Sequence, residues 1–257
     1  MVSTGKVILL LSYICIATIS ASIITPALPE IEHSYNLNSG ALDWIISIFL
    51  LGYVLGQLFY GPIANHYGRV HSLRVGLTIN ISGIVMCLVV TSISTSEYYI
   101  LLLIGRFISA LGSSSGLVCA IILINELLPP ARAKKAMAFI PISYIAFSGF
   151  AVAVGGAITE YLNWQACFWF LLAHGVVMLG LTYGIKETLQ EKICFMPHYV
   201  ARGFMNALKQ PKLVVFSFML GTLTVIFYAY TAAAPLYTQM ELGLKPSTYG
   251  YWSLLNT

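Results

Sequence analysis

Charged residues are scarce in this sequence. Only 9% of the 257 residues are Asp, Glu, Lys or Arg, whereas 58% are hydrophobic, and the mean hydropathy is +0.84. A soluble domain carries roughly 25% charged residues, because it needs a solvated surface. The composition therefore excludes an ordinary cytosolic enzyme, a disordered chain and a collagen-like chain. It indicates a protein whose solvent is lipid, with room for seven or eight spanning helices of about 20 residues each.

Cysteine is also scarce, and its spacing is not that of a disulfide framework or a zinc site. No two of the five cysteines form a CxxC pair, and four lie within apolar runs. We therefore expect buried, unreactive thiols, with no bound metal or cofactor. The cysteines are Cys15, Cys87, Cys119, Cys167 and Cys194. The phosphate-binding motif GxxxxGK[ST] is absent, which argues against an ATP-driven pump, and nothing suggests an enzyme or a nucleic-acid partner.

Apolar runs long enough to cross about 30 Å of hydrocarbon recur along the chain. The first run is longer than the apolar part of a typical signal peptide and lacks an obvious cleavage site, so we expect a helix of the mature protein. An eighth run begins near Tyr249, and about nine residues at 1.5 Å each are too few to span. The seven predicted spanning helices are Val7–Pro26, Asp43–Ala64, Leu73–Ser94, Tyr99–Leu127, Ala136–Ile158, Ala166–Ile185 and Leu213–Tyr237.

The basic residues predict an orientation. With the N-terminus inside, the inner segments hold most of the 13 Lys and Arg residues, and the outer loops hold only Lys245. Positively charged loops stay on the cytoplasmic side, so the sequence predicts a multi-pass protein of the inner (plasma) membrane with a cytoplasmic N-terminus. The longest break, residues 186–212, is basic and amphipathic. It is either a helix along the inner membrane surface or a solvated linker.

Arg106 is the most informative single residue. It lies well inside the fourth predicted helix, where an arginine costs about 2.5–3.5 kcal/mol unless it faces protein or water. Ser109, Ser113 and Gly116 follow at the spacing of one helix face. One interpretation is a buried charge that lines a transport path. The other is an arginine that snorkels outward and binds backbone carbonyls. We favour the first, because charges within membranes generally mark function.

Small residues at helical spacing predict close helix packing. Gly52 and Gly56 form a GxxxG pair in the second helix, and Gly112 and Gly116 form another in the fourth. Such pairs let two helix backbones approach closely in lipid. Packing is a sufficient explanation for them.

The segment Gly61–Leu73, between the second and third helices, is expected to be an inner loop. Its glycines Gly61 and Gly68 permit a tight backbone, and Arg69 follows immediately. This segment resembles the signature loop of the major facilitator superfamily, G-x-L-A-D-R-x-G-R-K/R. Other segments resemble the bicyclomycin-resistance-type drug–proton antiporters of that family, in order along the chain. They are Pro26–Pro29, Gly52–Pro62, Arg106 (fourth-helix motif R-x-x-Q-G), Gly155 and Gly156 (end of the fifth-helix antiporter motif), Asn163–Gln165 and Tyr249–Tyr251.

The resemblance implies an all-α polytopic membrane protein. Residues 1–185 would form a six-helix N-terminal bundle of 3+3 inverted repeats, residues 186–212 a cytoplasmic basic linker, and residues 213–257 the seventh helix and the start of the eighth. Family members have twelve helices in two bundles around a cavity that opens alternately to each side. We therefore expect a chain interrupted in the eighth helix, with a missing C-terminal half as one partner.

The signature loop departs from the family pattern. Asn65 stands where the family has an aspartate that contacts a helix N-terminus of the other half, and His66 stands for the adjacent arginine. Asn65 can still cap a helix, but it lacks the charge–dipole contribution of about 0.3–1 kcal/mol. Arg69 remains, with Glu126 as its expected partner. The resemblance thus implies a conformational switch formed by Gly61, Asn65, Gly68, Arg69 and Glu126.

Proton coupling lacks an evident carboxylate. Ser22 stands where many of these antiporters have a first-helix acid, Ser109–Ala110 replaces the fourth-helix Gln-Gly, and Val152 replaces a fifth-helix proline. Proton exchange needs a carboxylate with access to both sides, and the acids near helices lie at helix ends. Asn80 and His174 read as structural polar residues. From the helices that line the family's cavity, the expected pathway residues are Gln57, Arg106, Ser109, Tyr144, Tyr228 and Ser22.

The resemblance implies an exporter of small, amphipathic, drug-like molecules that works by proton antiport with alternating access. Its partners would be the lipid bilayer, a small-molecule substrate and protons. Two alternatives remain open. One is an exporter of an endogenous metabolite such as a siderophore. The other is a truncated or degenerate transporter half with no transport of its own.

Overall fold

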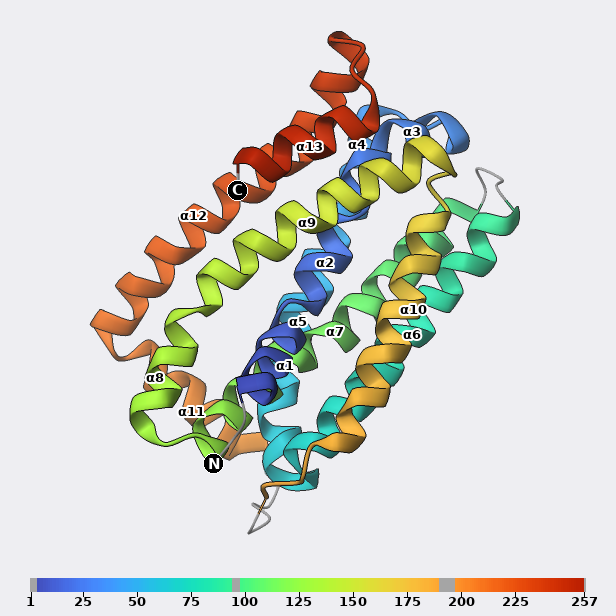
Figure 1. Ribbon diagram of the computed structural model, residues 1–257. Coiled ribbons are helices and arrows are strands. Elements are labelled where there is room, and N and C mark those ends of the chain that lie inside the picture. Colours follow the sequence, from blue (N-terminus) through green and yellow to red (C-terminus); the bar gives the residue numbers. More distant parts are fainter. Residues whose placement is uncertain (1–3, 94–97, 190–196, 257) are drawn as a thin grey trace.

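The computed structural model describes residues 4–93, 98–189 and 197–256, and it contains helices and no strand within these ranges (Figure 1). Six segments are long and apolar enough to cross a membrane. Residues Thr4–Tyr35 make a seventh if their two parts, bent by 45° against each other, count as one span. The seven predicted spans are therefore present. Ser94, the predicted end of the third, and Cys194 in the basic linker lie outside the described residues.

The first span is broken into short helices and runs further than predicted. It comprises α1 (Thr4–Ile14), α2 (Ile16–Ser22), the 3-10 turn η1 (Thr25–Ala27) and α3 (Leu28–Tyr35). The predicted end at Pro26 is wrong, because Pro26 and Pro29 stand in the first turns of η1 and α3, where no backbone N–H is required.

A single residue separates the next two spans. After the short α4 (Ser39–Leu42), helix α5 (Trp44–Tyr67) continues through Pro62, and α6 (Arg69–Ile93) begins directly after Gly68. Gly68 has φ 115°, a conformation that favours glycine. The predicted loop from Gly61 to Leu73 is therefore wrong. Gly61 lies within α5, and a Cβ there would meet nothing within 4 Å.

The remaining helices follow the predicted order. Helix α7 (Tyr99–Leu127) has the predicted bounds. The fifth span begins earlier than predicted, with α8 before α9, because Pro130 starts a new helix. The other elements are α8 (Pro130–Ala138), α9 (Ile140–Tyr161), α10 (Ala166–Leu181), η3 (Thr182–Gly184), α11 (Pro197–Leu208), α12 (Pro211–Leu236), the π-helical η4 (Tyr237–Glu241) and α13 (Pro246–Asn256).

Helix α7 is the centre of the packing, and glycines determine its distance from its neighbours. It packs against α5, α6 and α1, whereas α13 lies alongside α9 (Figure 1). A Cβ on Gly52 of α5 would lie 2.7 Å from the carbonyl oxygen of Phe107. A Cβ added to any of the glycines predicted to pack helices would likewise lie too close to the backbone of another element. Their lack of a side chain therefore permits the close approach of helices that packing in lipid requires. These glycines are Gly52, Gly56, Gly112, Gly116, Gly155 and Gly156.

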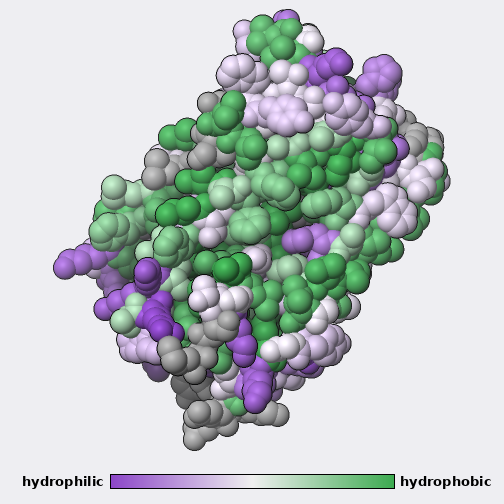
Figure 2. Space-filling view, viewed as in Figure 1, coloured by the Kyte–Doolittle hydropathy of each residue, from purple (hydrophilic) through white to green (hydrophobic). Residues whose placement is uncertain are grey.

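The surface is divided as a lipid environment requires. Hydrophobic residues cover the middle of the face in Figure 2, and hydrophilic residues gather toward its two ends. We call the end that carries the α5–α6 break, α8 and α11 the basic end (Figure 1). Cys15, Cys87, Cys119 and Cys167 are buried free thiols, as predicted.

Candidate functional site

Arg106 lies in the N-terminal third of α7, about two turns from its start, and is almost fully enclosed. Its exposed fraction is 1%, so its side chain does not snorkel outward. Nη1 donates to the carbonyl oxygen of Ser20 on α2 at 2.9 Å, and the guanidinium carbon lies 4.3 Å from the centre of the Phe49 ring on α5. The arginine thus bridges three helices through one carbonyl and one aromatic face.

Two donors of this guanidinium remain available. Within the described ranges, Nε and Nη2 of Arg106 have no hydrogen-bond partner, and neither has the adjacent Ser20 Oγ. The ion pairs in the same ranges involve other residues, so no carboxylate there neutralises Arg106. A buried cation with free N–H groups is costly unless an acceptor can reach it. Nε and Nη2 of Arg106 are therefore donors that a hydrogen-bond acceptor or an anion would satisfy if it reached them.

Tyrosines from three spans lie around the apolar cluster that contains Phe49, the ring in contact with Arg106. The hydroxyl oxygens of Tyr53 on α5 and Tyr144 on α9 are 3.4 Å apart. Tyr53 and Tyr228 of α12 pack against the same apolar cluster, which contains Phe49. The cluster joins α2, α5 and α7 to α12 and provides aromatic faces and hydroxyl groups together. Gln57 lies one turn beyond Tyr53, half-buried, and its side chain donates to the Tyr53 carbonyl at 3.4 Å.

A cavity of about 180 Å³ lies between α9, α12 and α13. Ser22 on α2 is buried and shares a hydrogen bond of 2.9 Å with Ser148, which lines this cavity. Ser22 therefore borders the space between the first bundle and the last two helices. The lining residues are Ser148, Val152, Phe227, Tyr230, Thr231, Tyr249 and Ser253.

Ser109 lies elsewhere. Its carbonyl and its hydroxyl oxygen both accept hydrogen bonds from the Asn80 side-chain amide, at 2.9 and 3.0 Å. It is therefore part of the contact between α6 and α7. His174 stacks on Phe170 within α10, with ring centres 6.4 Å apart.

Sequence reasoning missed Phe49, Tyr53 and Ser148. A signal existed for two of them, because Phe49, Tyr53 and Gln57 follow at intervals of four residues and so share one helix face. Gln57 is a predicted pathway residue, and the same spacing points to Phe49 and Tyr53 as its neighbours on that face. Ser148 had no comparable signal, since its role depends on where α12 and α13 pack.

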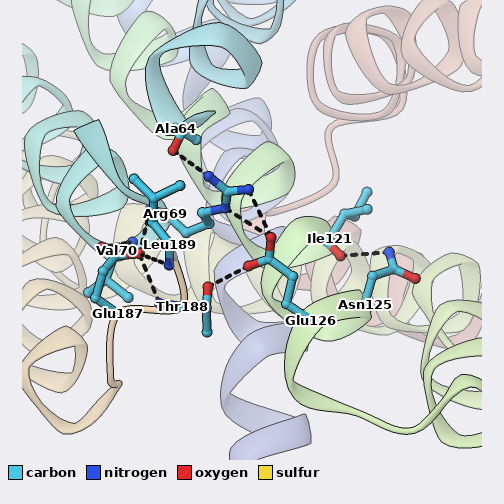
Figure 3. A network of polar contacts seen from close by, with 9 residues as sticks. All are labelled: Ala64, Arg69, Val70, Ile121, Asn125, Glu126, Glu187, Thr188 and Leu189. Carbon is cyan, nitrogen blue, oxygen red and sulfur yellow. Dashed lines mark hydrogen bonds and ion pairs between the residues drawn. The ribbon is translucent and has the colours of Figure 1, made fainter. Parts of the chain in front are cut away.

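A second polar cluster lies at the basic end, and Figure 3 shows it. Arg69, the first residue of α6, pairs with Glu126 at the end of α7, with 2.8 Å between Nη2 and Oε1. Its Nη1 donates to the Ala64 carbonyl at 2.9 Å. The contact expected between Arg69 and Glu126 is therefore present. It ties α5, α6 and α7 together, while its role in a conformational switch stays a prediction.

Glu187, at the start of the linker, completes this cluster (Figure 3). Its carboxylate accepts hydrogen bonds from the backbone N–H groups of Arg69, Val70 and His71, at 2.8, 3.0 and 3.3 Å. Burial would raise the pKa of Glu187, but these donors, with those of the next two residues, hold it below its ordinary value. Within the described ranges Glu187, and not Asn65, supplies the oxygens at the N-terminus of α6.

A Cβ on Gly68 would lie 2.5 Å from Glu187 Oε2, so the glycine also makes room for this carboxylate. The hydroxyl of Thr188 donates to the other oxygen of Glu126. Two consecutive residues therefore fasten the linker, Glu187 to the start of α6 and Thr188 to the end of α7.

At the opposite end, contacts join the first bundle to the last two helices. Glu160 of α9 lies 3.4 Å from the Lys245 ammonium and accepts a hydrogen bond from the Ser247 N–H at 3.2 Å. The Gln239 side chain of η4 donates to the Pro26 carbonyl at 2.9 Å. These contacts close this end of the interface.

Comparison with known proteins identifies the family. Residues 10–256 match the Major Facilitator Superfamily. Multidrug resistance protein D of Escherichia coli (strain K12) is 25% identical over 189 residues, which cover 74% of this chain and 46% of that protein. The bicyclomycin resistance protein homolog of Haemophilus influenzae is 22% identical over 90% of this chain and 57% of its own length. The chain thus spans about half the length of these relatives.

Solved structures agree on the fold. A bacterial homolog of the human lysosomal transporter Spinster, in an inward-facing and unoccupied conformation, superposes with a TM-score of 0.74 at 16% identity, covering 98% of this chain and 60% of that one. The inward-open xylose transporter XylE of E. coli gives 0.64 at 16% identity, over 84% of this chain and 56% of its own. The match over nearly all of its residues shows that this chain belongs to the Major Facilitator Superfamily, and the shared helical fold agrees with it.

Proposed function

We propose that this chain belongs to a secondary transporter that exports small amphipathic molecules across the inner membrane. The relatives named for resistance to several drugs and to bicyclomycin support this substrate class. The observation that carries the proposal is Arg106, a buried cation within a span whose Nε and Nη2 donors are unpartnered in the described ranges.

The surroundings of Arg106 suit an amphipathic ligand. Phe49, Tyr53, Tyr144 and Tyr228 offer aromatic surface for an apolar body. The free guanidinium donors and the tyrosine hydroxyls offer partners for its polar groups. Ligand sites combine mostly apolar walls with a few placed polar groups in this way. We place the substrate between α5, α7 and α9 on one side and α12 on the other.

Alternating access would use the two ends of this interface. For the cavity to open at the end where Glu160 meets Lys245, that ion pair and the bond between Gln239 and Pro26 must separate. At the basic end, we propose that the cluster of Arg69, Glu126 and Glu187 keeps α5, α6 and α7 moving as one body. We propose that the proton gradient drives export by antiport, because the sequence resembles that of drug–proton antiporters.

An efflux assay tests the proposal. The chain is expressed in a bacterial strain lacking its main efflux pumps, and accumulation of ethidium and a panel of amphipathic antibiotics is measured. We expect lower accumulation with the native chain and full accumulation with Arg106→Ala. Arg132→Ala, which changes an exposed arginine of α8, is the matched control and should retain efflux. A protonophore should raise accumulation in the native case. Equal accumulation with and without the chain, at confirmed membrane levels, contradicts export by this chain alone.

The alternative of a half-transporter follows from the shares of 46% and 57% of the two relatives that the chain spans. Transport by the purified chain in liposomes with an imposed pH gradient distinguishes an autonomous exporter from a half-transporter. Substrate movement by the chain alone supports an autonomous exporter. Movement only after co-reconstitution with a separately expressed C-terminal bundle supports a half that works with a partner.

A further inference from the structure

Helix α11, residues Pro197–Leu208, divides its residues into two faces. Ala201, Phe204 and Leu208 follow at intervals of three and four residues and share one face. Arg202 and Asn206, four residues apart, share the other. A helix with this separation needs an apolar partner along one side and water along the other.

The apolar face of α11 has no cover in the described part of the chain. The exposed fractions are 46% for Phe204, 56% for Met205 and 67% for Leu208. No described side chain of α11 is buried, and its main neighbour is α12, which directly follows it. Three large apolar side chains on one short helix therefore require a partner outside these residues.

The position of α11 limits what that partner can be. Only Lys209 and Gln210 separate it from α12, whose span begins at Pro211. Two residues reach at most about 7 Å. Helix α11 is therefore held at the membrane surface, at the basic end that also carries α8 (Figure 1). An amphipathic helix so close to the bilayer can reach the boundary between headgroups and acyl chains.

The charge of this region selects anionic lipid. Arg202, Lys209 and Lys212 lie in or beside α11, and the sequence has no Asp or Glu between Lys192 and Met240. Anionic headgroups attract basic segments next to a spanning helix. We propose that α11 lies in the plane of the membrane surface at the basic end. There it buries Phe204 and Leu208 among lipid chains and binds anionic phospholipid headgroups through Arg202 and Lys209. This anchor fixes the start of α12 independently of what the protein transports.

Introduced cysteines test the placement in liposomes of stated composition. The full chain with Cys194→Ser keeps its four buried cysteines. It receives one new cysteine, at Ala201 on the apolar face or at Asn206 on the polar face, and carries a fluorophore there. The liposomes contain phosphatidylcholine with or without phosphatidylglycerol, plus phosphatidylcholine spin-labelled near the headgroup. We expect the label at 201 to be quenched at least about twofold more than the label at 206, because interfacial helices insert about 5–10 Å.

The binding of anionic headgroups by α11 is tested by changing the lipid composition, the salt concentration and the charges of the helix. Quenching at 201 should increase with phosphatidylglycerol and decrease at 1 M salt, where the screening length falls to about 3 Å. The double variant Arg202→Gln, Lys209→Gln should lose the dependence on phosphatidylglycerol. Lys134→Gln, Lys135→Gln, which removes two exposed charges of α8, is the matched control and should retain it.

Hydrogen exchange of the unmodified chain gives a second measurement that needs no substitution. Amides of residues 201–208 should exchange more slowly in phosphatidylglycerol-containing liposomes than in pure phosphatidylcholine. Two results overturn the proposal. Equal access of aqueous iodide to labels at 201 and 206 indicates a solvated linker. Protection of 201 without lipid quenching, at any composition, indicates that protein covers the apolar face.

Discussion

Arg106 is a charge that neutral groups hold inside a membrane-spanning helix. One carbonyl and the face of Phe49 compensate it, and no carboxylate in the described ranges does. A charge-assisted hydrogen bond contributes about 1.5–3 kcal/mol and a cation–π contact about 0.5–2 kcal/mol. Placing arginine at a helix centre costs about 2.5–3.5 kcal/mol. These contributions nearly cancel, so stability does not explain the residue.

A methionine at this position separates function from stability. We expect Arg106→Met to change the apparent melting temperature in detergent by only a few degrees, because the lost contacts and the removed desolvation cost offset each other. Efflux should be lost, because the free donors disappear. Paired melting and dye-accumulation measurements check this. A large fall in melting temperature would instead make Arg106 a structural staple between α2 and α7.

Glu187 carries a pH-dependent contribution to stability. Its folded-state pKa is lowered, so its contribution is present above the ordinary pKa of about 4.3 and is lost as the pH falls through the folded-state value. Glu187→Gln keeps an acceptor but removes the charge at the N-terminus of α6, which contributes about 0.3–1 kcal/mol. We expect the variant to be less stable than the native chain at pH 7, with a difference that disappears as the pH falls below the folded-state pKa of Glu187. Melting curves across this range check the difference, and a pH-independent gap would contradict it.

The functional residues that could be predicted from the sequence are those whose residue type is unusual for their position in the helix. Arg106 stands out because a charge in an apolar run is rare, and Arg69 because it follows a glycine in a motif-like segment. Glu187 gave no such signal. It lies in a polar linker, where a glutamate is ordinary, and its bonds to residues 69–71 depend on tertiary folding. Tyr53 and Phe49 were missed for a similar reason, because aromatic residues are common throughout these spans.

At the level of the elements, helix existence was predictable and helix boundaries were less so. The sequence predicts a helix end at Pro26 and an inner loop from Gly61, yet helical structure passes through both positions. In lipid an unpaired backbone group is costlier than a strained turn, so the chain stays helical and satisfies the freed groups locally. Gly68, with its positive φ, does end a helix as its sequence suggests.

Two glycines provide a matched test of packing. A Cβ on Gly112 would collide with the backbone of Asn80 and Gly76 in α6, whereas one on Gly61 would meet nothing within 4 Å. We expect Gly112→Ala to destabilise the protein by about 1–3 kcal/mol through overpacking. Gly61→Ala should be neutral or stabilising by about 0.5–1 kcal/mol, because alanine favours a helix more than glycine does. Detergent melting curves compare them, and equal shifts would contradict the packing of α6 on α7.

At the level of the whole molecule, the distribution of charge predicts orientation. Helix α8, which carries Lys134 and Lys135, lies at the basic end with α11 (Figure 1), and so does the α5–α6 break, where Arg69 begins α6. Glu160 belongs to the last turn of α9, at the opposite end. Since cytoplasmic loops carry the excess of Lys and Arg, the basic end should face the cytoplasm. The apolar band between the ends in Figure 2 fits a molecule that crosses the bilayer in this direction.

Cysteine labelling in intact cells checks the orientation. Leu162 is exposed beyond α9, and Lys134 is exposed on α8 at the basic end. With the four described native cysteines buried and Cys194→Ser, a membrane-impermeant maleimide should label Leu162→Cys in intact cells. It should label Lys134→Cys only after permeabilisation. The opposite pattern would place the basic end outside. It would also remove the anionic inner leaflet as the surface for α11, so this measurement bears on the lipid anchor as directly as on topology.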